Sequence, residues 1–243
     1  MSLTRIFTDS RLDCNESVDL GETASHHINK VLRMKPGQKI QVFNGSGGYY
    51  DAEITAVERR AVTVIPLQHI SEERESNLKI TLVQGISRGQ RMDYTIQKAV
   101  ELGVNQIVPL FTEFSNVKLE GSRIQNRLTH WRSVIINACE QCKRTRVPGI
   151  TGPVTLSDWI SGDQHPLKII LDPGSGKNMR EINPREPLIS LISGPEGGFS
   201  ETEITTAVEA GYQAIGLGPR VLRTETAAIS ALSAVQVLWG DMG

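Results

Sequence analysis

The chain has 243 residues, of which 39% are hydrophobic and 22% are charged, and its formal net charge is -1. This composition is typical of a globular protein and excludes disordered, collagen-like and low-complexity chains. The sequence contains no apolar run of the ~18 residues that a membrane helix needs, and its N-terminus lacks a signal-peptide core, so we expect a soluble cytoplasmic protein.

The first 70 residues have the pattern of a small β-rich unit. Short β-prone runs lie at 39–43, 49–54 and 61–66, and the turn-forming sequence NGSGG joins the first two. The segment 23–34 has the apolar spacing of a helix, which we expect to plug a small barrel. The polar stretch 71–77 then has the composition of a linker.

Strands and helices alternate from residue 78 onward. Apolar runs predict strands at 78–84, 106–110, 167–171, 188–193 and 213–217. Amphipathic spacing predicts helices at 92–103 and 122–143, another that begins at Ser200, and a closing helix that ends at Trp239. Such alternation is typical of an α/β fold with a parallel sheet that helices cover on both faces.

Basic residues are concentrated in the middle of the chain. Residues 71–150 carry 12 basic and 8 acidic side chains, whereas the two flanking segments are neutral or acidic. The clusters KRTR and SRGQR contain Lys143, Arg144, Arg146, Arg88 and Arg91. Clustered cations can form a phosphate-binding surface, but a solvated helix end has the same pattern, and charge alone does not separate the two.

The cysteines predict neither a disulfide framework nor a metal site. Cys14, Cys139 and Cys142 are an odd set, and the single CxxC has no second pair to complete a zinc site. His26 and His27 are adjacent, but no further ligands accompany them in the sequence. We therefore expect reduced thiols and no bound metal.

Three of the predicted strands run directly into glycine-rich loops, at 172–177, 194–200 and 218–226. Any one loop could be a simple tight turn, but ligands of open parallel sheets bind where strands end, so three such loops predict one pocket. Ser200 and Glu203 have the spacing of a capping box that starts the next helix. The loop DPGSGK lacks the first glycine and the final Ser or Thr of a phosphate-binding P-loop, which favours an apolar, adenosine-type ligand.

These loops and other blocks of the chain resemble a known family. The sequences SGPEGGFSETEI and LGPRVLRTETAAISAL are similar to the C-terminal signature of the ribosomal RNA small subunit methyltransferase E family, which belongs to the knotted SPOUT methyltransferases. RMDYTIQKAVELGV, NACEQCKRTRVPGI, HHINKVLRMKPGQ and VFNGSG resemble further family blocks in the same order. The resemblance covers nearly the whole chain and is weakest in 151–187.

The resemblance implies a two-domain protein. Residues 1–72 would form a PUA-like RNA-binding β-barrel, and residues 73–243 would form an α/β SPOUT methyltransferase domain with a deep C-terminal trefoil knot. It further implies S-adenosylmethionine as methyl donor, transfer to N3 of uracil 1498 in 16S ribosomal RNA, and a homodimer. The RNA could be free or part of the assembled small ribosomal subunit.

The resemblance also implies particular site residues. The expected cofactor-binding positions are Leu171, Gly194, Pro195, Glu196, Gly197, Leu217, Gly218, Leu222, Arg223 and Thr224. On the basis of charge, we expect RNA phosphates to be bound by Arg5, Arg33, Arg88, Arg91, Lys143, Arg144 and Arg146.

The chemistry of uracil N3 narrows the catalytic candidates. N3 carries a weakly acidic proton, so it becomes a good nucleophile only when a base removes that proton or a cation stabilises the anion. The candidates are Arg223, Glu140, Gln141, Arg144 and Glu225. Two simpler interpretations remain open: Glu140 and Arg144 could form a surface i,i+4 pair, and Glu225 could complement a helix dipole.

Other functions also fit parts of the sequence. A non-catalytic RNA-binding protein would explain the β-rich unit and the basic segment, but it would not need three glycine loops around an apolar pocket. A nucleotide- or flavin-binding enzyme would explain the loops but not the basic segment. A methyltransferase that acts on a different RNA would explain both.

Overall fold

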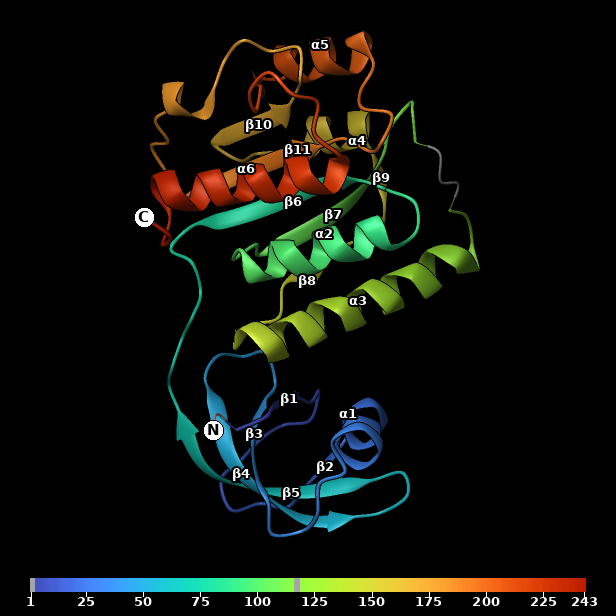
Figure 1. Cartoon of the computed structure of the whole chain (residues 1–243), viewed down its shortest axis with the longest axis vertical. Helices are drawn as coiled ribbons and strands as arrows, with labels where there is room; N and C mark the ends of the chain where they lie inside the picture. The colour runs from blue at the N-terminus through green and yellow to red at the C-terminus, as the bar shows by residue number, and fades with distance from the viewer. Residues whose placement is uncertain (1–2, 116–118) are drawn as a thin grey trace. The chain divides into compact units, whose positions relative to one another are not determined.

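The structure, a computed structural model, describes residues 3–115 and 119–243 of the chain (Figure 1). Its contacts divide the chain into two compact units. Unit 1 comprises Met1–Glu75 and Ile136–Val147, and unit 2 comprises Ser76–Ile135 and Pro148–Gly243. Unit 1 is therefore discontinuous in sequence. None of the helices in the described part of the chain combines the length and apolar character that membrane crossing needs.

Unit 1 is built around a five-stranded sheet with the order β1-β3-β4-β5-β2. The strands are β1 (Arg5–Phe7), β2 (Val18–Leu20), β3 (Lys39–Phe43), β4 (Tyr49–Val57) and β5 (Val62–Ile70). β3, β4 and β5 pair as an antiparallel meander, as the spacing of the β-prone runs predicts. Alternate strand positions, among them Ile40, Val42, Ile54, Val62 and Val64, are fully buried in one apolar core.

The helix that the sequence predicts at 23–34 is not one regular helix. It consists of α1 (Glu22–His26) followed directly by the π-helical turn η1 (His27–Leu32). Ile28 is fully buried in the core of unit 1, so the segment does cover the sheet. The turn ends at Arg33, whose φ of 52° is left-handed. Because a π-turn admits an extra residue, the regular 3.6-residue spacing could not predict it.

The stretch 71–77 is not a free linker, contrary to the composition-based expectation. Glu75 forms a bidentate ion pair with Arg144, and both side chains are almost fully buried. Glu73 contacts the guanidinium of Arg146 at 3.2 Å. The two acidic residues thus hold residues 144–146 inside unit 1, a contact between distant segments that composition cannot reveal.

In the described part of the chain, unit 2 contains a seven-stranded sheet in which all the pairs are parallel. The order is β12-β10-β11-β6-β7-β8, and β9 also pairs with β7. The strands are β6 (Lys79–Gly85), β7 (Gln106–Phe111), β8 (Gly149–Ile150), β9 (Val154–Thr155), β10 (Leu167–Leu171), β11 (Leu188–Ser193) and β12 (Gln213–Ile215). The predicted α/β fold with a parallel sheet is therefore confirmed, as is the β-rich unit that precedes it.

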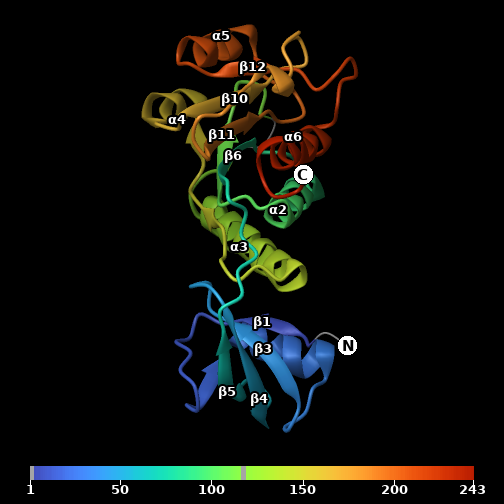
Figure 2. The ribbon, with the colours of Figure 1, turned by 90° about the vertical axis from the view of Figure 1, so that its left-hand side faces the viewer.

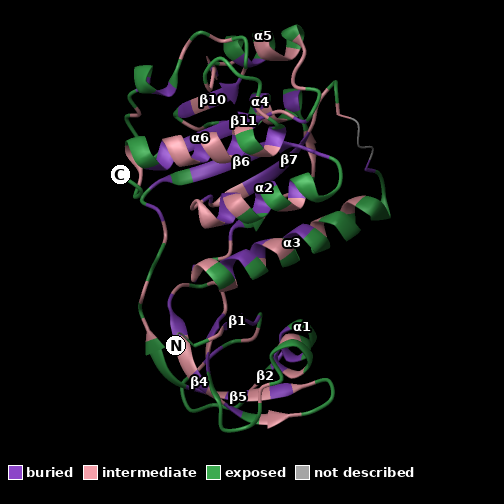
Figure 3. Ribbon diagram, viewed as in Figure 1, coloured by how far each residue is buried: buried purple, intermediate pink, exposed green. Residues whose placement is uncertain are grey.

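Helices cover both faces of this sheet, and its central strands are almost entirely buried (Figures 2 and 3). α2 (Gln90–Glu101) and α6 (Thr224–Trp239) pack together on one face. α4 (Leu156–Gly162) and α5 (Glu201–Glu209) lie on the other, where Leu156 and Ala207 join a core with strand residues. The remaining helices are α3 (Ser122–Cys142) and the short 3-10 turn η2 (Met179–Glu181).

The start of α5 agrees with its sequence signal. Ser200 accepts a hydrogen bond from the backbone N–H of Glu203, and the Glu203 carboxylate accepts one from the N–H of Ser200. This capping box satisfies two backbone donors at the helix N-terminus. It also fixes the end of the loop 194–200.

A buried polar network joins the amino ends of the parallel strands. Asp163, whose side chain is fully buried, accepts hydrogen bonds from the backbone N–H of His165 at 2.9 Å and from the Tyr212 hydroxyl. Tyr212 in turn accepts a bond from Trp159 Nε1 at 2.9 Å, and His165 Nε2 lies 3.1 Å from Thr81 Oγ1. The network links the segments before β10 and β12 to β6.

The charge of Asp163 is coupled to folding. Burial alone would raise the pKa of this carboxyl, but hydrogen bonds from His165 and Tyr212 outweigh burial and lower the pKa below its ordinary value. A carboxyl whose pKa is lower in the folded state stabilises the fold at pH values above its unfolded pKa of ~3.9. That contribution is lost as the pH falls below about 4.

We predict that Asp163→Asn lowers the free energy of unfolding at neutral pH by about 3 kcal/mol, because it leaves the buried donors of His165 and Tyr212 without a carboxylate. Urea unfolding followed by circular dichroism measures this change. Below about pH 4 the gap between wild type and variant should narrow. Asp241→Asn, at an exposed aspartate of the same unit, is the control and should change stability by less than ~0.5 kcal/mol. A gap that is constant from pH 7 to pH 3 would contradict the coupling.

Candidate functional site

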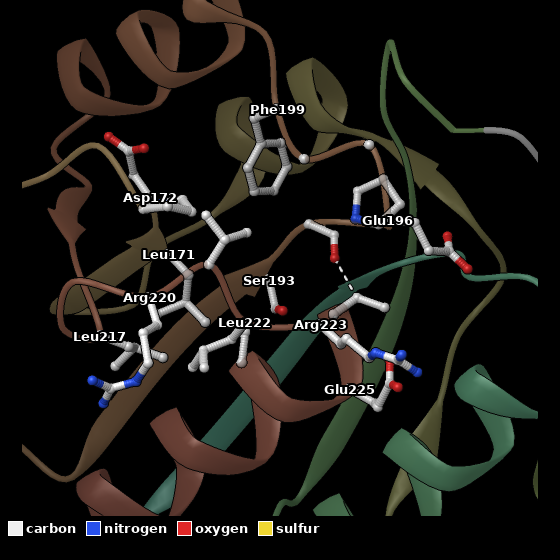
Figure 4. Close-up of a pocket in the computed structure, with 18 of the residues that line it drawn as sticks. Leu171, Asp172, Ser193, Glu196, Phe199, Leu217, Arg220, Leu222, Arg223 and Glu225 are labelled. Atoms are coloured by element: carbon white, nitrogen blue, oxygen red, sulfur yellow. Dashed lines mark hydrogen bonds between the residues drawn. The ribbon is translucent and has the colours of Figure 1, made fainter.

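A pocket of about 650 Å³ lies in unit 2 at the carboxyl ends of β10, β11 and β12 (Figure 4). It is lined by the segments that follow these three strands and by the first turns of α6. These segments contain the three glycine-rich loops that the sequence singles out. The structure thus brings the loops together around one cavity.

Strand register is what brings the loops together. β10 lies between β11 and β12, and Leu171 is level with Ile215, while Ile170 is level with Ile192. Because the three strands are parallel and end at nearly the same level, the chain leaves the sheet three times at one edge. β11 also pairs with β6, where Ser193 is level with Gln84.

All ten residues expected to bind the cofactor line this pocket, as does the catalytic candidate Glu225. The expected residues are Leu171, Gly194, Pro195, Glu196, Gly197, Leu217, Gly218, Leu222, Arg223 and Thr224. Their roles in binding stay predictions. The pocket is also lined by residues that the sequence analysis did not assign to the cofactor, and these are Arg91, which it assigned to RNA, and Asp172, Pro173, Ser193, Gly198, Phe199, Ile204, Ile215, Arg220, Val221 and Ala227.

The walls of the pocket are mainly apolar, whereas its rim carries charge. Leu171, Ile215, Leu217 and Leu222 supply aliphatic surface from the strand ends and the third loop. In Figure 4 Leu171, Leu217 and Leu222 lie in the left half of the view, and Arg223 lies on the right. An apolar slot beside exposed backbone suits a flat heterocycle better than a polyphosphate.

A buried hydrogen-bond network fixes the second and third loops. Thr224 Oγ1 donates to the carbonyl of Gly194 at 2.6 Å, the bond drawn as a dashed line in Figure 4. The Gln84 amide donates to Thr224 Oγ1 at 3.1 Å and lies 3.4 Å from the same carbonyl. The start of α6 is thereby tied to the end of β11 through a side chain of β6. Sequence reasoning missed Gln84, since a glutamine in an apolar strand gives no periodic signal.

Two glycines here are required by protein neighbours. A Cβ on Gly85 would lie 2.3 Å from the backbone nitrogen of Pro195, and a Cβ on Gly197 would lie 2.7 Å from Cβ of Phe114. On sequence grounds, Gly197 is expected to bind the cofactor. The structure shows that the close neighbour is the β7–α3 segment, so a larger residue would displace the loop itself.

Glu196 connects the second loop to the start of α2. Its carboxylate accepts hydrogen bonds from the backbone N–H of Arg88 at 2.9 Å and from Arg91 Nη1 at 2.8 Å. Partial burial would raise the pKa of Glu196, but these donors outweigh burial and lower the pKa. A predicted RNA-binding residue, Arg91, is therefore paired with a predicted cofactor-binding residue.

Arg223 and Glu225 stand at the start of α6 on one side of the pocket (Figure 4). The described residues give the exposed Arg223 guanidinium no hydrogen-bond or ion-pair partner. Glu225 Oε2 is shielded from solvent and has no hydrogen-bond partner among the described residues. Because a buried acceptor without a donor is costly, this oxygen is a candidate to accept a proton or a hydrogen bond from a ligand of the pocket.

The other catalytic candidates lie in unit 1. Glu140 and Gln141 line a separate cavity there, and their role in catalysis stays a prediction. The simpler interpretation, a surface pair of Glu140 with Arg144, is wrong. Glu140 instead accepts a hydrogen bond from the backbone N–H of Phe7 at 2.9 Å, and Arg144 is buried against Glu75.

The seven expected RNA-binding residues differ in accessibility. Arg33, Arg88, Arg91 and Arg146 are exposed, and Lys143 is half-buried. Arg5 and Arg144 are buried: Arg5 donates to the Lys143 carbonyl at 2.6 Å and lies over the Tyr49 ring, and Arg144 binds Glu75. Burial lowers the pKa of Arg5. In this conformation neither of the two buried guanidinium groups presents its donors to RNA.

Across residues 3–115 and 119–243, no group of three or more His, Cys, Asp or Glu side chains is arranged to hold a metal ion. Cys139 is buried, which raises the pKa of its thiol to about 12. Cys14, Cys139 and Cys142 form no disulfide with one another.

Two family models match the chain. Residues 74–236 match a model described as an RNA methyltransferase domain, and residues 20–67 match one described as an RNA methyltransferase PUA domain. The first match covers most of unit 2, and the second lies within unit 1.

Full-length relatives agree with these matches. The chain is 36% identical over 241 residues to the ribosomal RNA small subunit methyltransferase E of Buchnera aphidicola subsp. Schizaphis graminum, which covers 99% of this chain and 98% of that protein. A methyltransferase of Legionella pneumophila, solved with the bound cofactor SAM, superposes with a TM-score of 0.97 at 40% identity over the whole of both chains. A ribosomal RNA small subunit methyltransferase E of Neisseria gonorrhoeae bound to S-adenosyl methionine superposes with a TM-score of 0.92 at 37% identity, again over all of both chains. The chain therefore belongs to the ribosomal RNA small subunit methyltransferase E family.

Proposed function

We propose that this protein transfers a methyl group from S-adenosylmethionine to N3 of one uridine in 16S ribosomal RNA. The family resemblance implies that this uridine is uracil 1498. The observation that carries the proposal is the pocket in unit 2, where an apolar cavity meets the exposed guanidinium of Arg223 and a Glu225 carboxylate oxygen that has no hydrogen-bond partner among the described residues. Small-molecule pockets of ~300–1,000 Å³ are typical of cofactor sites, and this one measures about 650 Å³.

The residues of the pocket fit S-adenosylmethionine. Leu171, Leu217 and Leu222 offer apolar surface for an adenine ring, and backbone groups of the second and third loops can hydrogen-bond its polar edge. The Legionella and Neisseria structures were solved with this molecule, and their identity to this chain supports the same cofactor here.

When bound, the cofactor supplies an electrophilic methyl group on a sulfonium. Glu225 would take the proton from uracil N3 as that N–H bond breaks, and N3 would take the methyl group as the sulfur–methyl bond of the cofactor breaks, which leaves S-adenosylhomocysteine as the product. The charge of the deprotonated ring spreads onto O2 and O4. The planar Arg223 guanidinium can donate to two adjacent acceptors at once and so stabilise this charge.

Further properties belong to the same proposal. Exposed cations of both units, among them Arg33, Arg88 and Arg146, would bind RNA phosphates. The domain division at residues 72 and 73, the trefoil knot and the homodimer follow from the family resemblance, and the cytoplasmic location follows from the sequence composition. All four stay predictions.

Methylation of purified RNA tests the proposal directly. The protein is incubated with labelled S-adenosylmethionine and either naked 16S ribosomal RNA or assembled small subunits, and the position is mapped by primer extension. A methyl group on N3 blocks the Watson–Crick edge, so reverse transcriptase should stop at one uridine. Label in a different RNA added to the same assay would support a methyltransferase with another substrate, whereas RNA binding without any transfer would support a non-catalytic RNA-binding protein.

We predict that Leu217→Trp weakens S-adenosylmethionine binding by about tenfold or more, because the larger ring fills space that the adenine needs. Calorimetric titration measures the affinity. Leu188→Trp makes the same change at an exposed leucine at the other end of β11 and should bind as the wild type does. Equal affinity of all three proteins would place the cofactor elsewhere.

We predict that Arg223→Lys slows the methyl transfer by roughly 10² to 10³, because the ammonium keeps the charge but loses the two-pronged geometry. Single-turnover methylation at saturating cofactor measures this rate, and the cofactor affinity should be nearly unchanged. If the variant instead loses cofactor affinity at an unchanged rate, Arg223 binds the cofactor rather than the reacting base.

We predict a dimer in solution, because α6 and the residues after it leave Val237, Leu238 and Met242 more than 40% exposed although they are apolar. Light scattering at micromolar concentration should give twice the 26.7 kDa mass of the chain. Val237→Lys should shift the equilibrium toward the monomer. A wild-type mass of 26.7 kDa would refute the dimer.

A further inference from the structure

Unit 1 contains a cavity of about 690 Å³ that shares no residue with the pocket in unit 2. Its walls come from the beginning of the chain, from α1 and η1, and from the end of α3. The lining residues that matter for its chemistry are His27, Val31, Leu32, Asn137, Glu140, Gln141 and Lys143.

Glu140 gives the cavity a fixed, mostly buried carboxylate. Its side chain is 13% exposed, Oε1 accepts the backbone N–H of Phe7 at 2.9 Å, and Oε2 lies 4.0 Å from His27 Nδ1. Burial raises the pKa of this carboxyl, which the Phe7 N–H and His27 only partly offset. A carboxylate at such a position loses hydrogen bonds from water. A ligand with hydrogen-bond donors would replace those bonds.

Two amide side chains flank this carboxylate. Asn137, Glu140 and Gln141 are three and four residues apart on α3, so they project from the same face of the helix. Asn137 and Gln141 are exposed. The end of α3 therefore presents acceptors and donors side by side, the arrangement that reads the edge of a nucleobase.

The opposite side of the cavity is formed by a rare backbone conformation. Val31 and Leu32 belong to the π-helical turn η1, and Val31 is 62% exposed. π-helical turns are rare and are frequently found at functional sites. Here the turn directs aliphatic side chains to the surface, where the face of a flat ring can pack.

Lys143 adds a cation to the rim. Its φ of 69° is left-handed, which is unusual for a residue other than glycine, and the buried Arg5 holds its carbonyl at 2.6 Å. Lys143 Nζ lies 3.4 Å from the Leu3 carbonyl, which leaves further donor capacity on the ammonium. A left-handed backbone at a residue other than glycine is strained, and such strain is typical of binding sites when the surrounding contacts maintain it.

From this arrangement we infer that the cavity of unit 1 binds one unstacked guanosine of the RNA substrate. Guanine presents N1–H and the N2 amino group side by side, which matches the Glu140 carboxylate, and its O6 can accept from the Gln141 or Asn137 amide. The base would pack on Val31 and Leu32, and its phosphate would meet Lys143. The ligand class rests on the proposed function, since RNA is the substrate there.

Nucleotide binding to the full-length protein tests the inference. Calorimetry or ligand-observed NMR measures the affinity of the protein for guanosine monophosphate, inosine monophosphate and uridine monophosphate. Inosine monophosphate differs from guanosine monophosphate only in lacking the N2 amino group. Guanosine monophosphate should bind about tenfold more tightly than either. A short oligouridylate with one central guanosine should bind more tightly still, because it brings more than one phosphate.

Variants connect this binding to the cavity. Glu140→Gln keeps an acceptor for the Phe7 N–H but removes the negative charge. This variant should weaken the binding of guanosine monophosphate by about tenfold. Gln141→Ala, at an exposed position, should weaken it by about fivefold even if the first variant folds poorly. Glu16→Gln, at an exposed carboxylate outside the cavity, is the matched control and should bind as the wild type does.

S-adenosylmethionine affinity of the same proteins separates the two proposals. Retained cofactor binding with weakened guanosine binding supports the inference, whereas absent cofactor binding in the wild type would contradict only the proposed function. Three results would overturn the inference: equal affinity for guanosine and inosine monophosphates, no effect of either cavity variant, or an oligonucleotide that binds more weakly than the free nucleotide.

Discussion

The parallel register of β10, β11 and β12 is the constraint on which the site depends. Because Leu171 is level with Ile215, and Ile170 with Ile192, three separate segments leave the sheet at one edge. A shift of one residue would turn the buried side chains of a strand toward the opposite face and would move its loop. The bond from Thr224 to the Gly194 carbonyl can form only when this register is kept.

The two ends of the sheet in unit 2 perform different tasks. At the amino ends, the polar groups of Asp163, Tyr212 and His165 form hydrogen bonds with one another. At the carboxyl ends, Arg223 and Glu225 Oε2 have no partner among the described residues. Stability and ligand binding are thus separated along the strands, as expected of open α/β folds.

Sequence reasoning predicted the parallel sheet and the convergence of the glycine loops, because apolar runs and glycines leave local signals. It could not predict contacts between distant segments. The ion pair of Arg144 with Glu75 joins two charged stretches that look solvated when each is considered alone. The amide of Gln84 and the close approach of Phe114 to Gly197 are likewise visible only when strands far apart in sequence are neighbours. The π-helical turn η1 was not predicted, because its residues do not follow the spacing of a regular α-helix.

The discontinuity of unit 1 affects how the chain can fold during synthesis. Its sheet is complete at Ile70, but the partners of Glu75 and of the Phe7 N–H are in the segment Ile136–Val147. At ~5–20 residues per second the ribosome needs several seconds to add the residues in between. During that interval the nascent unit has the Glu75 carboxylate without its ion pair, so the order of translation delays its completion until part of unit 2 has emerged.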